Sequence, residues 1–294
     1  MAFDLEVTSS GQRLARLGLS RPFGGGSYST SSESLSTEGF VGRYYSPPPG
    51  PPRTAVLLIG GSDGGMPGPL LAGHLASDGY PTLALTYFSE PGLPQTLSSI
   101  PLEYFATALR WLATQPGVDA KRMVVMGVSR GSEAAMLLAA NYTDLVDGVV
   151  ASVPSNVALC AFPGCGGAAW TLHGAPVPYT VQFNNPAPTD DPSAVIPVER
   201  MRGALLLDCG GEDLVWDSCP YAHAIIDRLN RHAYPFPHQL QEYPHAGHGV
   251  GGLVPYEPGL DLGAPAKLAG TASDSNELAR QLLWPKVLAF LAAE

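Results

Sequence analysis

From residue 54 to the end of the chain, apolar segments that fit buried strands alternate with segments that fit helices. TAVLLIGG, PTLALTYF and RMVVMGVS are rich in β-branched and other apolar residues, as are strands buried on both faces of a parallel sheet. Such alternation predicts one α/β domain with a mostly parallel central sheet flanked by helices. We expect strands at 54–61, 81–88, 122–129, 147–155, 203–211 and 238–247, and helices at 70–79, 101–117, 131–142, 221–231 and 275–293.

Three stretches depart from this pattern. Residues 1–50 predict an N-terminal arm with a strand or two, including 39–47, and a flexible Ser- and Gly-rich surface segment at 23–34, so we place the catalytic domain at 51–294. The stretch 156–200 is rich in Gly, Pro, Asn and Asp, and a loop that long inside a domain indicates a lid-like insertion. A second irregular stretch covers 249–272.

The composition fits a large folded domain and restricts its partners. Apolar residues make up 45% and charged residues 14% of the 294 residues, so the chain can bury a sizeable core. The net charge of −10 argues against a nucleic-acid partner, because phosphate binding needs a basic surface. No apolar run approaches ~20 residues, and the start MAFDLEVTSS lacks the features of a signal peptide. We therefore expect no membrane span and a cytoplasmic protein.

The four cysteines are Cys160, Cys165, Cys209 and Cys219, and their spacing lacks the CxxC pairs of a zinc site. Cys160 and Cys165 could pair in an oxidising compartment. In a reducing cytosol the expectation is free thiols.

The chain contains two matches to Gly-x-Ser-x-Gly, GGSDG at 60–64 and GVSRG at 127–131. A nucleophile elbow needs a strand before its serine and a helix directly after it. GVSRG fits, because RMVVMGVS precedes it and the good helix formers of 132–140 follow it. GGSDG does not fit, because Gly-Met-Pro-Gly-Pro cannot start a helix at once. The candidate nucleophile is therefore Ser129.

The first match has another predicted use. It follows the first core strand, where this architecture places a glycine-rich loop that lends a backbone N–H to the oxyanion hole. Gly61 or Ser62 would supply that N–H, and Arg130, the residue after the nucleophile, would supply the other. The alternative is that 60–65 is only a tight turn.

A serine nucleophile needs a base, and seven histidines are available. Only His245 and His248 lie at or just after the end of the last expected strand, where the catalytic loop belongs. Glycines flank His248, so it can reach over the edge of the sheet, and we prefer it. The spacing HAGH could suggest a metal pair, but no third ligand is evident, and no metal or cofactor is implied.

The acid that orients the base is expected between the serine and the histidine in sequence. LLLDCGGEDLVWDS offers Asp208, Glu212, Asp213 and Asp217. Asp208 lies within the expected strand and Asp217 lies past the turn. Asp213 comes just after the carboxyl end of the strand, where the sites of α/β proteins gather, and it is our candidate. The predicted chemistry is acyl transfer through an acyl-enzyme on Ser129.

GVSRGSE, IPVERMRGALLLDCGGEDLVWDS and YPHAGHG together resemble the C-terminal catalytic domain of the acyl-CoA thioesterase / bile acid-CoA:amino acid N-acyltransferase family, a relative of the dienelactone hydrolases. The resemblance runs from about residue 39 to the C-terminus. It implies an α/β-hydrolase fold. It also implies a triad whose acid stands three residues before a Trp and whose His follows a Gly. Those roles map onto Ser129, Asp213 (before Trp216) and His248.

The sequence departs from this family in three ways. Full-length members carry an N-terminal β-sandwich domain, whereas this chain has a short arm. The amino-acid-conjugating branch uses cysteine, so serine favours hydrolysis without excluding transfer to an alcohol or amine. The insertion at 156–200 is longer than is common in the family.

Glu133 stands where the family tends to have a Glu, and we interpret it as an acid at the start of a helix that could also contact a loop.

The resemblance implies an acyl thioester substrate, either an acyl-CoA or an acyl-carrier-protein thioester. The alternatives are an acyltransferase or cyclase that releases a lactone or ester, a carboxylesterase of the dienelactone hydrolase type, and an inactive hydrolase fold that serves as a binding module. Phosphate contacts of CoA could come from Arg130, Arg200 and Arg202, although ordinary ion pairs are the expectation for them. The sequence does not indicate an oligomeric state. Candidate residues for the acyl pocket, which fit the core as well, are Val153, Phe162, Trp170, Tyr179, Phe183 and Trp216.

Overall fold

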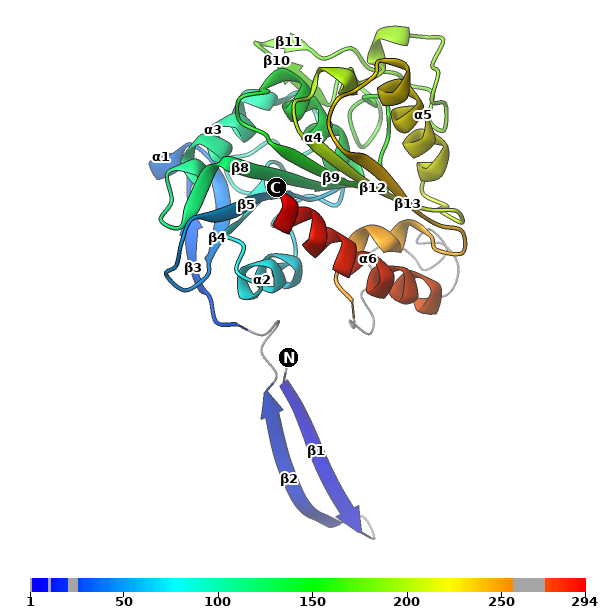
Figure 1. Ribbon diagram of the computed structural model, residues 1–294. Coiled ribbons are helices and arrows are strands. Elements are labelled where there is room, and N and C mark those ends of the chain that lie inside the picture. Colours follow the sequence, from blue (N-terminus) through cyan, green and yellow to red (C-terminus); the bar gives the residue numbers. More distant parts are fainter. Residues whose placement is uncertain (1, 10–11, 21–25, 256–272) are drawn as a thin grey trace.

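An eight-stranded, mostly parallel sheet forms the centre of the molecule (Figure 1), as the alternating pattern predicts. The computed structural model describes residues 2–9, 12–20, 26–255 and 273–294. Its strand order is β13-β12-β9-β8-β5-β6-β4-β3, and only the pairs β6–β4 and β4–β3 are antiparallel. The strands are β3 (Ser29–Glu33), β4 (Val41–Ser46), β5 (Arg53–Ile59), β6 (Thr82–Thr86), β8 (Val118–Val128), β9 (Gly148–Ser152), β12 (Ala204–Gly210) and β13 (His238–Tyr243).

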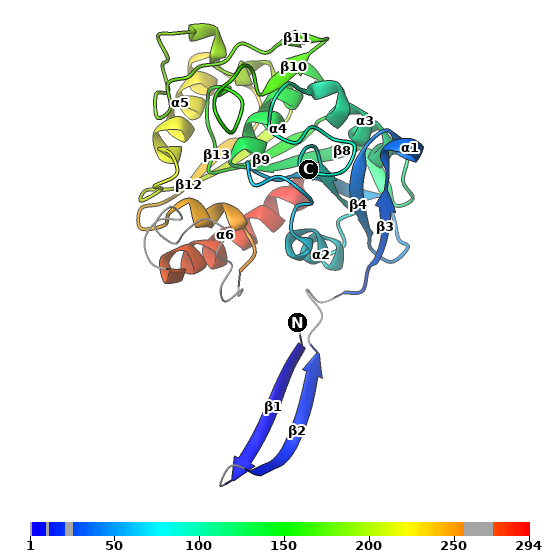
Figure 2. The ribbon, with the colours of Figure 1, turned by 180° about the vertical axis from the view of Figure 1, so that it is seen from behind.

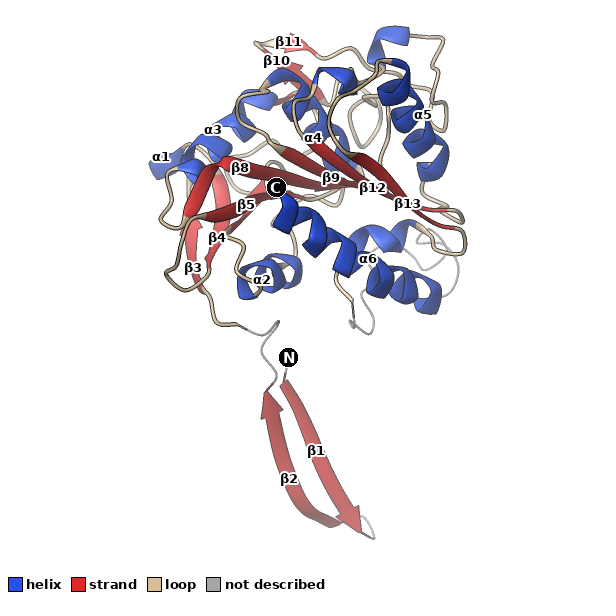
Figure 3. Cartoon of the chain, in the orientation of Figure 1, coloured by secondary structure: helices blue, strands red, loops and turns tan. Residues whose placement is uncertain are grey.

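Helices cover both faces of this sheet (Figure 3). Successive side chains of a strand point to opposite faces. Accordingly, Leu57 and Ile59 pack in the core cluster under α3, α4 and α5, whereas Val56 and Leu58 pack in the cluster with α2 and α6. The helices are α1 (Leu35–Glu38), α2 (Pro69–Ser77), α3 (Leu102–Ala113), α4 (Arg130–Asn141), α5 (Ser218–Arg231) and α6 (Ser273–Ala293), with a 3₁₀ helix η3 at His248–Gly252.

The insertion at 156–200 lies between β9 and β12 and packs on the layer of α3, α4 and α5 (Figures 1 and 2). It contains β10 (Trp170–Leu172), β11 (Ala175–Pro176) and two 3₁₀ turns, η1 (Pro192–Ala194) and η2 (Val198–Arg200). β10 also pairs in parallel with β7 (Ile100–Pro101), so a small second sheet joins the insertion to the start of α3. Its role as a lid stays a prediction.

The N-terminal arm contains more strand than the sequence predicts. β1 (Ala2–Ser9) and β2 (Gln12–Ser20) form a hairpin, and β3 and β4 join the central sheet. The expectation of a flexible segment is therefore wrong for 29–33, which form edge strand β3, while 23–25 lie outside the described residues. The second irregular stretch, 249–272, begins within η3, and its residues 256–272 also lie outside the described residues. The domain boundary near residue 50 stays a prediction.

The cysteines form two disulfides, Cys160–Cys165 and Cys209–Cys219, so the expectation of free thiols is wrong. Cys209 lies at the carboxyl end of strand β12 and Cys219 in the first turn of α5. The intervening loop folds back to bring them together. Disulfides are rare in reducing cytosol, so this finding weighs against the cytoplasmic prediction. Among the helices in the described part of the chain, none combines the length and apolarity needed to cross a membrane.

Candidate active site

Ser129 lies in the turn between β8 and α4, as a nucleophile elbow requires. Its backbone has φ 55° and ψ −123°. A non-glycine residue reaches such a left-handed φ only at a cost in free energy, so the surrounding structure must hold it there. α4 begins at the next residue, Arg130, so the positive end of the helix dipole lies beside Ser129.

Ser62 lies in a different environment. Residues after it form turns, and α2 begins only at Pro69, so no helix starts at this serine. The glycine-rich loop nevertheless lies next to the nucleophile, because a Cβ built on Gly61 would be 3.3 Å from the Ser129 Cβ. The predicted second donor of the oxyanion hole should lie in this loop, beside Ser129.

Asp213 and His248 lie together on the other side of the site. Nδ1 of His248 is 2.8 Å from Oδ2 of Asp213. Oδ1 of Asp213 accepts hydrogen bonds from the backbone N–H groups of Val215 (3.0 Å) and Trp216 (3.3 Å). The Asp213 side chain is 1% exposed and that of His248 is 12% exposed. The buried carboxylate therefore fixes one ring nitrogen of His248, which leaves Nε2 for a reacting group.

His248 also lies close to the elbow. A Cβ on Gly251, in the same 3₁₀ helix as His248, would be 2.8 Å from Cγ2 of Val128, the residue before Ser129. The Trp216 ring lies 5.7 Å from the His248 ring and its indole N–H donates to the carbonyl of Val153. The structure thus brings the serine, acid and base segments to one edge of the sheet; their catalytic roles stay predictions.

The rejected alternatives have other partners. His245 is exposed, and its Nδ1 lies 3.2 Å from Oε1 of Glu212. Asp208 is buried within β12, where its carboxylate accepts a hydrogen bond from Ser152 Oγ. Asp217 is the N-cap residue of α5. Over the described ranges there is no group of three His, Cys, Asp or Glu side chains that could hold a metal ion.

Two residues of α6 hold the His248 loop, and the sequence reasoning missed them. Asn276 Oδ1 accepts a hydrogen bond from the backbone N–H of Gly247 (2.7 Å), and Arg280 donates to the carbonyl of Gly249 (2.8 Å). Both side chains are buried. Polar residues inside an otherwise apolar helix face are the only sequence signal that could have identified them.

The candidate pocket residues divide into buried and exposed groups. Trp170 and Trp216 are buried in the core, and both indole N–H groups are engaged by protein acceptors. Phe162 and Phe183 are 44% and 49% exposed, and Tyr179 is half-buried. Three surface cavities of about 520, 400 and 500 Å³ are not lined by Ser129, Asp213 or His248, so they give no information on the acyl pocket.

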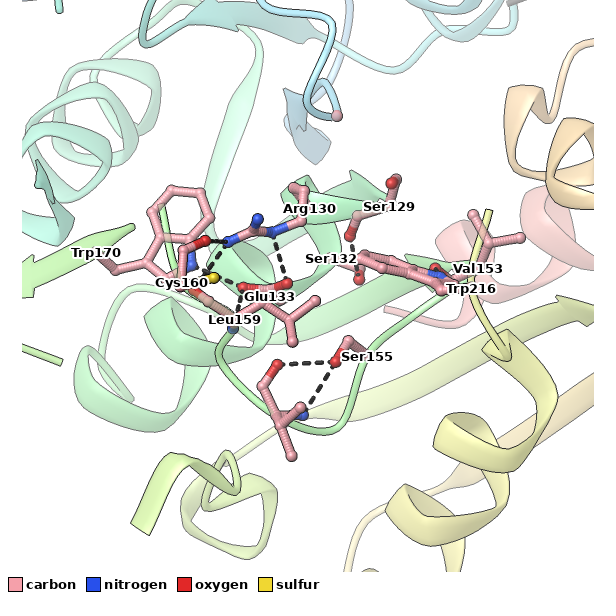
Figure 4. A network of polar contacts seen from close by, with 12 residues as sticks. Ser129, Arg130, Ser132, Glu133, Val153, Ser155, Leu159, Cys160, Trp170 and Trp216 are labelled. Atoms are coloured by element: carbon pink, nitrogen blue, oxygen red, sulfur yellow. Dashed lines mark hydrogen bonds and ion pairs between the residues drawn. The ribbon is translucent and has the colours of Figure 1, made fainter. Parts of the chain in front are cut away.

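Arg130 and Glu133 form a buried ion pair at the start of α4, with Nε 2.7 Å from Oε1 (Figure 4). Burial raises the pKa of Glu133, and the adjacent Arg130 lowers it. Glu133 Oε2 accepts hydrogen bonds from the indole N–H of Trp170 (2.9 Å) and the backbone N–H of Leu159 (3.2 Å). Arg130 is therefore an ion-pair residue rather than a phosphate contact. Arg200 is exposed, and its role as a phosphate contact stays a prediction.

Comparison with known families places this geometry in context. The sequence matches the family described as "BAAT / Acyl-CoA thioester hydrolase C terminal" over residues 100–162 and 170–293. Acyl-coenzyme A thioesterase 6 of Mus musculus is 31% identical over 223 residues, which cover 72% of this chain and 52% of the relative. Acyl-coenzyme A amino acid N-acyltransferase 2 of Mus musculus is 27% identical over 74% of this chain and 53% of the relative. The chain thus spans about half the length of the curated relatives it matches.

Solved structures confirm the fold. A crystal structure of a putative dienelactone hydrolase from Klebsiella pneumoniae subsp. pneumoniae matches with a TM-score of 0.60 and 16% sequence identity. The match covers 91% of this chain and 100% of the other. The α/β-hydrolase fold predicted from the sequence is therefore confirmed.

Proposed function

Because the chain belongs to the BAAT / acyl-CoA thioester hydrolase family, we propose that it is a serine hydrolase that cleaves an acyl thioester, either an acyl-CoA or an acyl-carrier-protein thioester. The observation that carries the proposal is the 2.8 Å contact between His248 and Asp213, beside the strained turn of Ser129. An acid, a base and a nucleophile in these positions are the parts of an acyl-transfer triad.

In the proposed mechanism, Ser129 Oγ attacks the thioester carbonyl carbon while Nε2 of His248 takes the hydroxyl proton. Asp213 keeps the Nδ1–H tautomer and stabilises the imidazolium. The backbone N–H of Arg130 and that of Gly61 or Ser62 bind the oxyanion, and each such donor contributes about 3 kcal/mol in well-studied hydrolases. The intermediate then expels the thiolate, which receives the proton from His248.

Water completes the cycle. His248 removes a proton from a water molecule that attacks the acyl-enzyme, and collapse of the second tetrahedral intermediate returns that proton to Ser129 Oγ. The products are a free carboxylic acid and a thiol. An amine or alcohol in place of water would give an amide or ester, so hydrolysis and transfer differ only in the second nucleophile.

The test is turnover of a panel of acyl-CoAs, acyl-carrier-protein thioesters and p-nitrophenyl esters, with products identified by mass spectrometry. Wild type should release free acid from thioesters, and Ser129→Ala should lose at least ~10³-fold in kcat. Ser62→Ala is the matched comparison. It removes a hydroxyl from the other Gly-x-Ser-x-Gly site but keeps the backbone N–H, so its loss should be far smaller.

The possible results separate the alternatives. Turnover of oxygen esters alone would replace the thioesterase proposal with a carboxylesterase. Formation of an amide, ester or lactone would identify an acyltransferase or cyclase. An active Ser129→Ala with an inactive Ser62→Ala would show that the nucleophile has been assigned to the wrong serine.

A further inference from the structure

Tyr87 lies under the glycine-rich loop and is not among the residues that the reaction above uses. Its hydroxyl is within hydrogen-bond distance of the carbonyl oxygens of Gly60 (2.8 Å) and Gly61 (2.9 Å), so its one proton is shared between them. Tyr87 is 2% exposed, and burial raises its pKa well above the usual range, so the hydroxyl stays a donor. It fixes the orientation of the peptide units on one side of the site.

The other side of the site is held by Arg130. Its guanidinium Nη2 donates to the carbonyls of Leu159 and Cys160, both at 3.0 Å, while Nε pairs with Glu133 (Figure 4). Arg130 is 3% exposed and Glu133 is fully buried. The residue that follows the nucleophile is thereby tied to the insertion through its side chain, and its backbone N–H cannot turn freely.

Trp170 connects these two sides. Its indole N–H donates to Glu133 and its ring lies 5.9 Å from the ring of Tyr87. Both rings also contact Phe105, with centroid distances of 5.2 Å to Tyr87 and 6.1 Å to Trp170. A continuous buried path therefore runs from Arg130 through Glu133 and Trp170 to Tyr87.

The two backbone segments at the ends of this path also touch directly. A Cβ built on Gly131 would lie 2.4 Å from the carbonyl oxygen of Gly60. A small movement of the glycine-rich loop would therefore press on the first turn of α4 and so disturb Ser129, the residue just before it, which is held at a left-handed φ.

We propose that Tyr87, Trp170, Glu133 and the Arg130 side chain act as one set of positioning residues, which sets the separation and orientation of the two N–H groups of the oxyanion hole. This rests on the proposed function in its use of Ser129 as the nucleophile and of the two backbone N–H groups as the oxyanion hole. The set touches no substrate. It acts through the backbone N–H of Arg130 and that of Gly61 or Ser62, and oxyanion-hole donors stabilise a transition state only when they are aimed in advance at the developing charge.

Tyr87→Phe is the primary test, because it keeps the ring and removes the one proton that orients the loop. Its kcat should fall about 10- to 100-fold with KM changed less than ~2-fold, because misplaced donors weaken transition-state binding more than substrate binding. The inhibition constant of an alkyl trifluoromethyl ketone should rise by the same factor as kcat/KM falls. This probe forms a tetrahedral adduct on Ser129 whose oxygen becomes the oxyanion.

Tyr104→Phe is the matched control. The Tyr104 hydroxyl also makes two backbone hydrogen bonds, to the carbonyl of Thr86 (2.6 Å) and from the N–H of Val41 (2.8 Å), but outside this set. It should lower the melting temperature about as much as Tyr87→Phe does and leave kcat unchanged. All rates are expressed per site labelled by a fluorophosphonate, so a loss of folded protein does not count as a loss of rate.

Glu133→Gln tests the far end of the path. The amide keeps an oxygen for Trp170 but removes the charge opposite Arg130. If the path acts as one unit, the double variant Tyr87→Phe/Glu133→Gln should lose much less than the product of the two single losses in kcat. If the losses multiply, the two ends act independently and the set is not a unit.

The proposal is overturned if Tyr87→Phe matches Tyr104→Phe in kcat and in inhibition by the trifluoromethyl ketone. The proposed function fails separately, if wild type turns over no thioester. In that case the same variants are compared on oxygen esters, or through the rate at which the fluorophosphonate labels Ser129. That rate also depends on an oxygen entering the oxyanion hole.

Discussion

Relative to wild type, Asp208→Asn should be more stable at pH 8 than at pH 4. The reason is that Asp208 is a carboxyl group that the fold buries completely. It is 0% exposed in β12, next to Ser152 of β9. Ser152 Oγ donates to its Oδ2 at 2.6 Å, and Oδ1 has no hydrogen-bond partner. Burial raises its pKa from the ordinary value of 3.8 to about 7, and the hydrogen bond from Ser152 only partly opposes this rise.

The sign and size of the effect follow from proton linkage. Between pH 4 and pH 7 the unfolded chain releases the Asp208 proton while the folded chain retains it. The stability that the neutral carboxyl provides is therefore fully present below pH 4 and is lost as pH rises to about 7. A pKa rise of about three units corresponds to ~4 kcal/mol in the free energy of unfolding. Asparagine carries no such titration, so the variant should lack this decline.

The assay is urea unfolding of wild type and Asp208→Asn at several pH values from 4 to 8, followed by circular dichroism. The difference in free energy of unfolding, variant minus wild type, should grow by ~4 kcal/mol across this range. Groups that titrate equally in both proteins cancel in the difference. Ser152→Ala removes the donor that lowers the pKa of Asp208, so in that variant the decline should extend to higher pH.

A difference that stays constant within about 1 kcal/mol, close to the error of extrapolation, would refute the reasoning. It would mean that water or a structural change solvates Asp208 in the folded protein. A decline confined to pH below 5 would carry the same meaning, because the carboxyl would then titrate near its ordinary pKa.

Three further predictions concern the site. Asp213→Asn should lower kcat about 10³- to 10⁴-fold with an unchanged melting temperature, because the amide favours the wrong tautomer of His248; steady-state kinetics and thermal melts would test both parts. Replacing Cys209 and Cys219 with alanine should lower the free energy of unfolding by ~2.7 kcal/mol, because their disulfide closes a loop with a sequence separation of 10; equal urea midpoints for wild type and variant, both without reductant, would contradict this. Asn276→Ala should lower kcat about 10-fold at constant KM by loosening the loop of His248, and a change in melting temperature alone would count against a role in positioning.

The sequence predicted the core strands because a strand buried on both faces has to be apolar along its whole length. β5 and β12 are buried at almost every position, and β12 departs from this rule only at Asp208. The sequence also predicted that Asp213 and His248 would be neighbours. The carboxyl ends of parallel strands share one edge of the sheet, so loops that follow β12 and β13 must meet there.

Edge strand β3 could not be predicted in this way. Its sequence, STSSE, is exposed on both faces and has no apolar alternation. It is a strand because its backbone pairs with β4, and that interaction leaves no mark in the side chains.

The Cys209–Cys219 disulfide and the burial of Glu133 were missed for a related reason. Both depend on the path of irregular segments, the loop after β12 and the insertion at 156–200. Glu133 follows the nucleophile on a helix, where an acid in the first turn is ordinarily solvated. It is buried only because the insertion folds over it and supplies Leu159 and Trp170 as donors. Local pattern carries no information about such a path.

The two Gly-x-Ser-x-Gly segments show how the same pattern can meet different physical demands. At GVSRG both glycines are required by space. A Cβ on Gly127 would lie 2.2 Å from the Gly131 carbonyl oxygen, and one on Gly131 would reach the Gly60 carbonyl. At GGSDG, a Cβ on Gly60 would meet nothing closer than 3.6 Å, whereas Gly64 has a φ of +71° and a Cβ there would lie 2.7 Å from the Phe88 ring. The first segment therefore needs glycine for close approach of strand, helix and loop, and the second needs it at Gly64 for a turn that packs against Phe88. Only the first arrangement forces a serine out between a strand and a helix, so the choice of Ser129 rests on packing that the pattern itself does not encode.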